Sequence, residues 1–489
     1  MDVEPKEHSD LLGSKQRNSN RTDDPNGCGD QPVTGPPDGG FKAYSVMVGS
    51  FLTNGLLFGV INSYSVIYPV LLKKLEEDKV ENAEIRASLV GVLTMGTTFI
   101  LSPVSGVLTA FLGLRRTAML GGSVAALGLL LSSFAVRHVD LLMVTYGLMY
   151  GLGASLAYTP SLAILGHYFK KYLSIVNGIV TIGSSVFTVI ISSLMGFMIN
   201  NYGLAWMFRL LSLITVGIAL CGLLFKPVPV VVIDKPLKKN KSVKNILKTI
   251  ENVELWRNSK YKWWAFSMPV ALFGYFVPYV HIGEFIKYLK FENVNVNLPL
   301  QCLAATGGVG RLFVGFLGDR RGINKIMLQQ ISFYVIGTLT IILPFVNSFG
   351  QIVAIALGIG LFEGGFISLI GPIAFELCGP ANAAQAIGFM LGIAAIPVMI
   401  GPPVAGAIVK RTDSYTLAFV MAGISPLVGA TLMFAIHFRN RGPMQPTQTH
   451  SNGHLAMATV NSTSNTLFSS GRHCVLAKRV AAVGASHGA

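Results

Sequence analysis

Charged residues are scarce in this sequence. They make up only 12% of its 489 residues, whereas a soluble globular domain carries about a quarter. Hydrophobic residues make up 51% of the chain. This composition excludes an ordinary soluble protein and indicates a membrane protein that crosses the bilayer many times.

The sequence also lacks the motifs of several enzyme classes. It has no G-x-x-x-x-G-K-[ST] phosphate-binding loop, which disfavours ATP-driven pumping, and no H-E-x-x-H zinc motif. No paired carboxylates suggest aspartyl chemistry. A membrane-embedded enzyme is therefore disfavoured, and we expect no catalytic residues, no cofactor and no metal.

Cysteines are few and show no useful spacing. The five cysteines form neither a disulfide framework nor a metal-ligand pattern. The net charge of +15 comes from basic residues divided among loops and a tail, and no nucleic-acid-binding motif accompanies them. We expect the lipid bilayer and a small molecule as partners, and no nucleic acid.

Long apolar runs, in contrast, are abundant. About twelve of them reach the ~20 residues that a helix needs to cross a ~30 Å hydrocarbon core. They predict an all-α membrane protein with twelve transmembrane helices. The predicted spans are residues 43–68, 87–111, 117–136, 140–165, 173–199, 204–225, 263–289, 298–318, 324–346, 350–377, 382–409 and 416–438.

A basic loop at residues 226–262 divides these spans into two sets of six. We therefore expect an N-terminal six-helix bundle at residues 43–225 and a C-terminal six-helix bundle at residues 263–438. Residues 1–42 and 439–489 are polar and are predicted to be disordered tails. The first tail has no short apolar core with a cleavage site, so no secretory signal peptide is expected.

Basic residues gather in alternate loops. The loop from Lys226 to Lys262 contains ten, and the other loops of the same side contain Arg115–Arg116, Lys170–Lys171 and Arg320–Arg321. The loops of the opposite side have about nine, interleaved with acidic residues. Because short basic loops resist translocation, both termini are predicted to be cytoplasmic.

Two equivalent loops, six spans apart, share a pattern. Residues 106–116 (GVLTAFLGLRR) and 315–322 (GFLGDRRG) both begin G-x-L and contain a pair of adjacent arginines. They resemble the loop signature of the major facilitator superfamily, although Ala110 replaces its usual acid. The resemblance implies two six-helix halves around a central cavity, rocking for alternating access about a midplane substrate site. The expected gating residues are Gly106, Gly113, Arg115, Arg116, Asp319, Arg320, Lys170 and Lys171.

Two opposite charges lie deep within predicted spans of the second half. Arg311 and Glu363 are each about 13 residues into their spans, or ~20 Å of helix. A lone charge at this depth costs at least ~3 kcal/mol, so such residues pair or line a cavity. One interpretation is a structural salt bridge. The other is a site where Arg311 receives a substrate carboxylate and Glu363 neutralises it when the site is empty.

Three segments resemble the monocarboxylate porter family. They are residues 36–44 (PPDGGFKAY), residues 166–185 (GHYFKKYLSIVNGIVTIGSS) and residues 371–408, which begin GPIAFELCGPANAAQAIGF. The last is most similar to the branch that carries aromatic amino acids and iodothyronines. That resemblance implies a functional pair at Arg311 and Glu363, a substrate-contacting His281, and a plasma-membrane location.

The resemblance also shows departures from the lactate-carrying branch. Its proton-coupling Lys aligns with Val66, and its Asp one turn before the Arg aligns with Gly307. We therefore predict facilitated diffusion rather than proton coupling. A proton-linked lactate or pyruvate symporter is the alternative within the carrier class, and a non-transporting nutrient sensor is the alternative outside it.

Three further residues are candidates to contact the substrate. Asn62 in the first span could line the cavity, with ordinary hydrogen bonding between helices as the alternative. Phe362 and Phe366 bracket Glu363 and could stack on an aromatic ligand, with generic packing as the alternative. Nothing in the sequence indicates an accessory single-span subunit.

Overall fold

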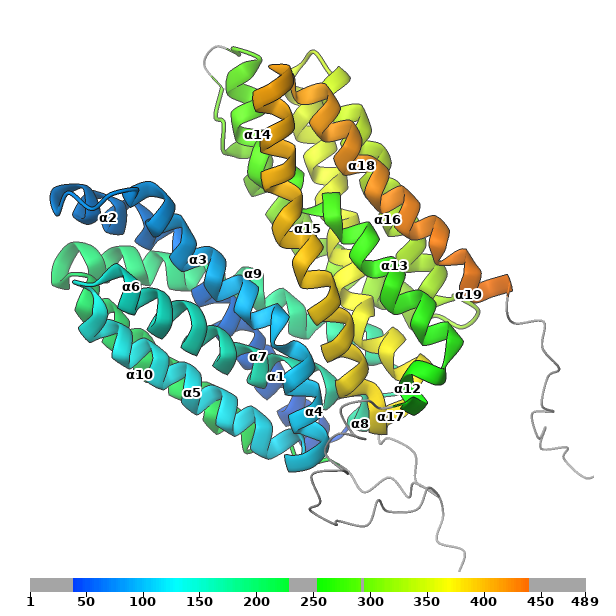
Figure 1. Cartoon of the computed structure of the whole chain (residues 1–489). Helices are drawn as coiled ribbons and strands as arrows, with labels where there is room; N and C mark the ends of the chain where they lie inside the picture. The colour runs from blue at the N-terminus through cyan, green and yellow to red at the C-terminus, as the bar shows by residue number, and fades with distance from the viewer. Residues whose placement is uncertain (1–37, 228–252, 292–293, 439–489) are drawn as a thin grey trace, which may run out of the picture. The chain divides into compact units, whose positions relative to one another are not determined.

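The computed structural model describes residues 38–227, 253–291 and 294–438 (Figure 1). The predicted C-terminal tail, residues 439–489, lies outside the described residues. So do most of the predicted N-terminal tail, residues 1–42, and most of the basic linker, residues 226–262. In the part of the chain that the structure describes, every regular element is a helix.

The first half of the chain contains ten labelled α-helices and one π-helix within the described residues. They are α1 (Phe41–Asn62), α2 (Tyr64–Glu77), α3 (Ala83–Ile100), α4 (Ser102–Leu112), α5 (Leu114–Ala135), α6 (Val139–Leu142), η1 (Met143–Tyr150), α7 (Gly151–Ala163), α8 (Leu165–Tyr168), α9 (Leu173–Tyr202) and α10 (Leu204–Gly222).

The described second half contains the remaining helices. They are α12 (Val253–Arg257), α13 (Ser259–Tyr275), α14 (Val277–Tyr288), α15 (Leu298–Gly318), α16 (Lys325–Ile342), the 3-10 turn η2 (Leu343–Phe345), α17 (Phe349–Thr412), α18 (Tyr415–Leu432) and α19 (Phe434–Phe438).

These helices make twelve crossings. The described residues contain 11 segments long and apolar enough to cross a membrane. The longest, α17, covers two predicted spans, because Gly379 has a φ of 71° and Pro380 follows it, so the helix is interrupted there. We call residues 349–378 the first part of α17 and residues 380–412 its second part. The predicted all-α, twelve-span architecture is confirmed.

Several spans are interrupted where proline follows. The seventh span breaks at Phe276, between α13 and α14, and Pro278 occupies the first turn of α14. The second span breaks at Leu101, ahead of Pro103 in the first turn of α4. Proline fits a first helical turn because it has no N–H to donate. The break at Phe276 separates two tyrosines that reach the candidate site.

The backbones of α15 and the first part of α17 approach each other closely. A Cβ added at Gly310 would collide with the carbonyl oxygen of Leu361, and one added at Gly364 would collide with that of Gly307. Small residues commonly permit such contact between membrane helices. The glycines therefore allow α15 and the first part of α17 to pack closely, and this packing brings Arg311 and Glu363 to neighbouring positions.

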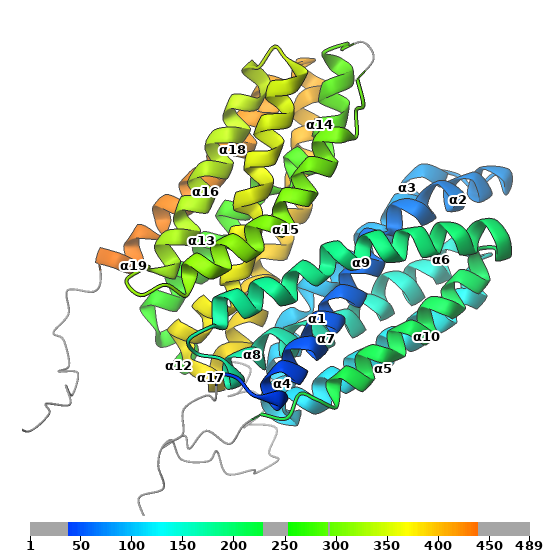
Figure 2. The same ribbon diagram turned by 180° about the vertical axis from the view of Figure 1, so that it is seen from behind.

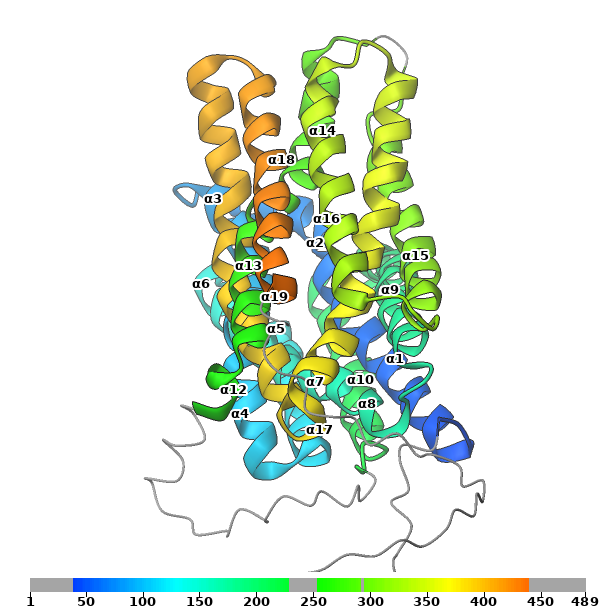
Figure 3. The ribbon, with the colours of Figure 1, turned by 90° about the vertical axis from the view of Figure 1, so that its right-hand side faces the viewer.

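The two halves touch through helices that are far apart in sequence. Helix α9 of the first half packs on α15 and α17 of the second half, and α4 packs on α17 (Figure 2). Within the second half, α18 packs against both α13 and α16 (Figure 3). The contact of α9 with α15 determines the surroundings of Arg311.

Candidate functional site

The side chain of Arg311 joins the two halves. It extends from α15, is only 8% exposed, and its Nη1 lies within hydrogen-bond distance of three acceptors on α9 of the other half. The acceptors are the Thr181 carbonyl oxygen at 2.7 Å, Ser184 Oγ at 2.7 Å and Ser185 Oγ at 3.2 Å. The guanidinium is thus held by groups that belong to the opposite bundle.

Glu363 lies on the other side of the guanidinium. Its Oε1 is 3.7 Å from Arg311 Nη2, and the residue is 5% exposed. This separation is longer than a direct hydrogen bond, so the contact is an ion pair without a short bond. The Nε of Arg311 is buried and has no hydrogen-bond partner within the described structure. Buried polar groups are normally paired, so an unpartnered donor at this depth is an exception among them.

Tyrosines hold the carboxylate of Glu363. Tyr275, the last residue of α13, donates its hydroxyl to Glu363 Oε1 at 2.9 Å. Tyr279 in α14 lies near the same carboxylate and against the Tyr275 ring, with centroids 5.7 Å apart. The break between α13 and α14 thus brings two tyrosines near one acid, and Tyr275 donates the hydrogen bond to it.

Phe366 and Phe362 differ in their surroundings. Phe366 is 3% exposed and packs its ring on Tyr275 and Phe333, at centroid distances of 5.1 and 4.9 Å. This packing favours a structural role, in which Phe366 positions the Tyr275 hydroxyl. Phe362 is only partly buried, so it has more surface available to a ligand.

The surroundings of Gly307 explain one departure from the lactate branch. A Cβ added to Gly307 would lie 2.6 Å from Glu363 Oε2. An aspartate at this position would place a second carboxylate against the first. Since two close carboxylates repel, an acid at position 307 would be unfavourable beside the Glu363 side chain in its present position.

The structure gives His281 and Asn62 other contacts. His281 Nε2 is 3.0 Å from the Pro402 carbonyl oxygen in the second part of α17. Because a carbonyl only accepts, Nε2 carries the proton in this arrangement. Asn62 donates to Thr188 Oγ1 at 3.2 Å, and that hydroxyl donates to the Ser184 carbonyl oxygen at 2.6 Å. Asn62 is thereby linked to the α9 segment that holds Arg311, and the substrate role of both residues stays a prediction.

A row of hydroxyl residues on α9 was not predicted from the sequence to belong to the site. Its members are spaced to lie on one face of the helix and comprise Thr181, Ser184, Ser185 and Thr188. Within an otherwise apolar span, this i, i+3, i+4, i+7 pattern could have indicated a polar stripe. The same reasoning missed Tyr275, because nothing local distinguishes it from other aromatic residues near helix ends.

Asp319 connects the halves at the end of α15. Its two carboxylate oxygens accept hydrogen bonds from the backbone N–H groups of Ser174 and Ile175, at 2.9 and 2.8 Å. These N–H groups belong to the first turn of α9, where helix N–H groups lack partners and the helix dipole favours negative charge. Burial raises the pKa of this carboxyl above its ordinary value, and the two N–H groups act in the opposite direction.

The other predicted gating residues divide into two groups. Gly106 lies between the halves, since an added Cβ would be 2.9 Å from the Ala384 carbonyl oxygen. Lys170 and Lys171 donate their backbone N–H groups to the carboxylate of Asp38, a contact within the first half. The remaining predicted residues lie in tight turns or on the surface: Gly113, with a φ of 83°, Arg115, Arg116, and Arg320, which covers the Phe316 ring.

Comparisons with known proteins agree with this architecture. The Major Facilitator Superfamily model matches residues 50–348 and 306–481. Monocarboxylate transporter 10 of Danio rerio is 41% identical over 404 residues, covering 82% of this chain and 79% of the relative. Monocarboxylate transporter 10 of Homo sapiens is 38% identical over 405 residues, covering 81% and 78%.

Solved structures share the fold at low sequence identity. The human organic anion transporter MFSD10 (TETRAN) has a TM-score of 0.64 and 13% identity, covering 80% of this chain and 99% of that one. The transporter FucP in the outward conformation has a TM-score of 0.62 and 14% identity, covering 81% and 100%. With its family model, relatives and helical architecture in agreement, this chain belongs to the monocarboxylate transporter family of the major facilitator superfamily and is a multi-pass membrane transporter.

Proposed function

We propose that this protein is a secondary transporter that moves small carboxylate-bearing solutes across the plasma membrane by alternating access. Arg311 receives the carboxylate and Glu363 is its partner. One observation carries the proposal: a deeply buried guanidinium, shared by both halves, has an unpartnered Nε and only a 3.7 Å contact to its acid. A planar guanidinium is well suited to bind a carboxylate through two parallel hydrogen bonds.

The contacts of Arg311 suggest how binding is coupled to movement. Thr181, Ser184 and Ser185 belong to the first half, whereas Glu363 belongs to the second. If the halves rock apart, the guanidinium loses its α9 acceptors and keeps its acid. A substrate carboxylate then takes the place of these neutral acceptors, and Glu363 compensates the charge of Arg311 when no substrate is bound.

Aromatic groups near the site favour a substrate with a ring. Tyr158 of α7 packs edge-on against Phe58 of α1, with centroids 5.0 Å apart, and also contacts Phe99 of α3. Tyr158 also lies within electrostatic range of Arg311. Aromatic rings pack favourably in such edge and offset geometries. Together with the resemblance of residues 371–408 to the branch that carries aromatic amino acids and iodothyronines, this supports those solutes as the substrate class.

We propose the orientation from the same helices. The turns that contain Lys170–Lys171 and Arg320–Arg321 lie at one end, joined by the contact of Asp319 with Ser174 and Ile175. Loops rich in Lys and Arg remain in the cytoplasm. That end is therefore cytoplasmic, and so are both termini.

Uptake by the purified protein tests the carboxylate receptor. We expect proteoliposomes to take up labelled tyrosine, and unlabelled tryptophan or iodothyronine to compete with it. Tyramine, which has the same ring and amine but no carboxylate, should compete at least about tenfold more weakly, because it leaves the buried guanidinium unsatisfied. Equal competition by tyramine would overturn the role of Arg311, and binding of tyrosine without any flux would indicate a sensor.

A proton gradient distinguishes facilitated diffusion from the symporter alternative. Glu363 is the acid next to Arg311, so a coupled proton would have to be carried there. We expect an imposed inward proton gradient, at zero membrane potential, to leave the initial rate of tyrosine uptake unchanged. Acceleration of several fold, lost in the Glu363→Gln variant, would establish proton coupling instead, and labelled lactate in the same vesicles would test that substrate.

A further inference from the structure

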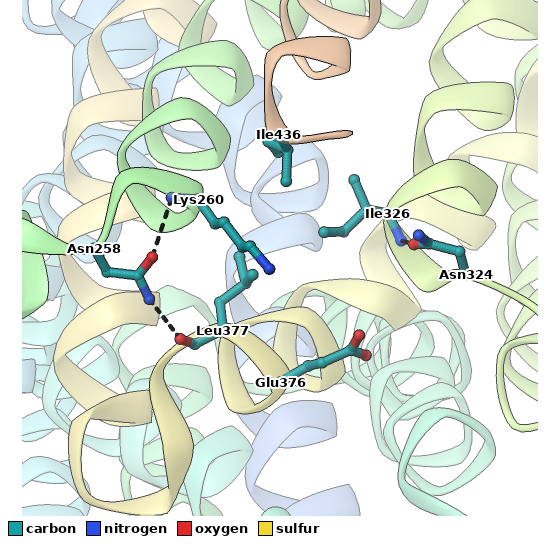
Figure 4. Close-up of a pocket in the computed structure, with 7 residues that line it drawn as sticks. All are labelled: Asn258, Lys260, Asn324, Ile326, Glu376, Leu377 and Ile436. Atoms are coloured by element: carbon teal, nitrogen blue, oxygen red, sulfur yellow. Dashed lines mark hydrogen bonds between the residues drawn. The ribbon is translucent and has the colours of Figure 1, made fainter. Parts of the chain in front are cut away.

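A cavity of about 360 Å³ opens at the proposed cytoplasmic end of the second half, away from Arg311 (Figure 4). Its walls come from the starts of α13 and α16, the end of the first part of α17, and α19. The lining residues are Asn258, Lys260, Asn324, Ile326, Glu376, Leu377 and Ile436.

The walls of this cavity are held in place. Asn258 donates to the Leu377 carbonyl oxygen at 2.7 Å, which ties α13 to the end of the first part of α17. Its Oδ1 accepts from Lys260 N at 3.0 Å, and Asn324 Oδ1 accepts from Ile326 N at 2.9 Å. Both asparagines thus cap their helices.

Positive charge exceeds negative charge around the cavity. Lys260 extends its ammonium group into the space, across from the carboxylate of Glu376 (Figure 4). Glu376 already pairs with Lys325, at 3.1 Å from Nζ. Within the described part of the chain, no acidic group forms an ion pair with Lys260. One ammonium is therefore left for an anion inside the pocket.

An apolar groove of about 520 Å³ adjoins the charged cavity. Its lining residues are Trp263, Thr431, Leu432, Phe434 and Ala435. Trp263 follows Lys260 by about one helical turn, and Ala435 precedes Ile436 of the cavity. Trp263, Leu432 and Phe434 are exposed. Exposed tryptophan next to lysine is typical of the membrane–water interface.

We propose that this cavity and groove bind one anionic phospholipid of the cytoplasmic leaflet. The phosphate group contacts the Lys260 ammonium in the cavity, and an acyl chain lies along Trp263 and Phe434. A free anion would use the cavity alone, whereas the adjoining groove matches an amphiphile. The inference depends on the proposed orientation and is independent of the solute that the protein carries.

Native mass spectrometry of the full-length protein in detergent tests this site. Titrated phosphatidylserine is expected to bind as a resolved 1:1 adduct. Lys260→Gln should weaken this adduct about fivefold, the effect of one basic residue on an anionic lipid. Lys262→Gln removes the same charge two residues along α13, outside the cavity lining, and should have little effect.

Two further experiments distinguish the possible ligands. Glycerophosphoserine, which has the headgroup without acyl chains, should not displace the lipid. Trp263→Ala, which leaves Lys260 intact, should weaken the phosphatidylserine adduct. Equal losses in Lys260→Gln and Lys262→Gln would overturn the proposal in favour of non-specific attraction. Binding of glycerophosphoserine as tight as that of the lipid would overturn it in favour of a soluble anion. Size-exclusion profiles establish that each variant is folded.

Discussion

Arg311→Gln is expected to reduce tyrosine uptake at least about thirtyfold at equal surface abundance. Removing one partner of a buried charge pair costs about 2 kcal/mol or more, and each 1.4 kcal/mol is a factor of ten. Arg311→Lys should also be defective, because an ammonium cannot form the paired hydrogen bonds of a guanidinium. Initial rates in proteoliposomes measure both effects. Arg137→Gln, at an exposed position after α5, is the matched control and should be normal.

A double variant separates the structural salt bridge from the carboxylate receptor. Arg311→Gln leaves Glu363 buried beside a neutral side chain, whereas Arg311→Gln/Glu363→Gln removes both charges. Replacement of a complete buried ion pair is often neutral for stability. We expect the double variant to regain thermal stability and surface abundance, but not uptake. If uptake returns with stability, the pair is structural and the receptor proposal fails.

Asp319→Asn is expected to shift the conformational equilibrium about thirtyfold toward states in which the two halves are separated at their proposed cytoplasmic ends. The variant removes the negative charge of the carboxylate that accepts hydrogen bonds from the Ser174 and Ile175 N–H groups, at 2.9 and 2.8 Å. Hydrogen bonds to a charged group and the favourable helix-dipole contact together contribute about 2 kcal/mol. If most ligand-free molecules have the Asp319 contact with α9 formed, the fraction with this contact broken should therefore rise measurably in the variant.

Distances between spin labels can measure this redistribution. Labels at Arg116→Cys, in the first turn of α5, and Arg321→Cys, in the turn after α15, occupy exposed positions of different halves in a protein whose native cysteines are replaced. Asp319→Asn should broaden and lengthen the distance distribution. Glu376→Gln disrupts the ion pair with Lys325 inside the second half alone, so it should leave the distribution unchanged. Identical distributions for the wild type and Asp319→Asn would remove Asp319 from the gate.

The helices were predictable because membrane insertion depends on local hydrophobicity. An apolar run of about 20 residues identifies a span whatever its neighbours are. The boundaries were less predictable. The first predicted span ends at residue 68, but α2 continues to Glu77, since Lys and Glu residues end the apolar run without ending the helix. The tenth and eleventh spans were separated correctly, at the interruption that Gly379 and Pro380 make in α17.

The depth of the charged pair also followed from the sequence alone. Counting residues along two apolar runs was enough to place Arg311 and Glu363 at a similar level, because an α-helix rises a constant 1.5 Å per residue. The contact between the two side chains did not follow from this residue count. It depends on the glycine-mediated approach of α15 and α17, and on the break at Phe276 that turns Tyr275 and Tyr279 toward one carboxylate.

The sequence by itself determined that this chain crosses a membrane about twelve times in two related halves, and which two charges are buried within it. Only the tertiary structure decided what those charges touch. It directs Arg311 toward hydroxyls of α9, joins His281 to the Pro402 carbonyl, and sets Asp319 at the start of α9. The reason is physical: hydrophobicity and helical rise are properties of a short segment, whereas hydrogen bonds between residues more than 100 positions apart depend on how helices pack.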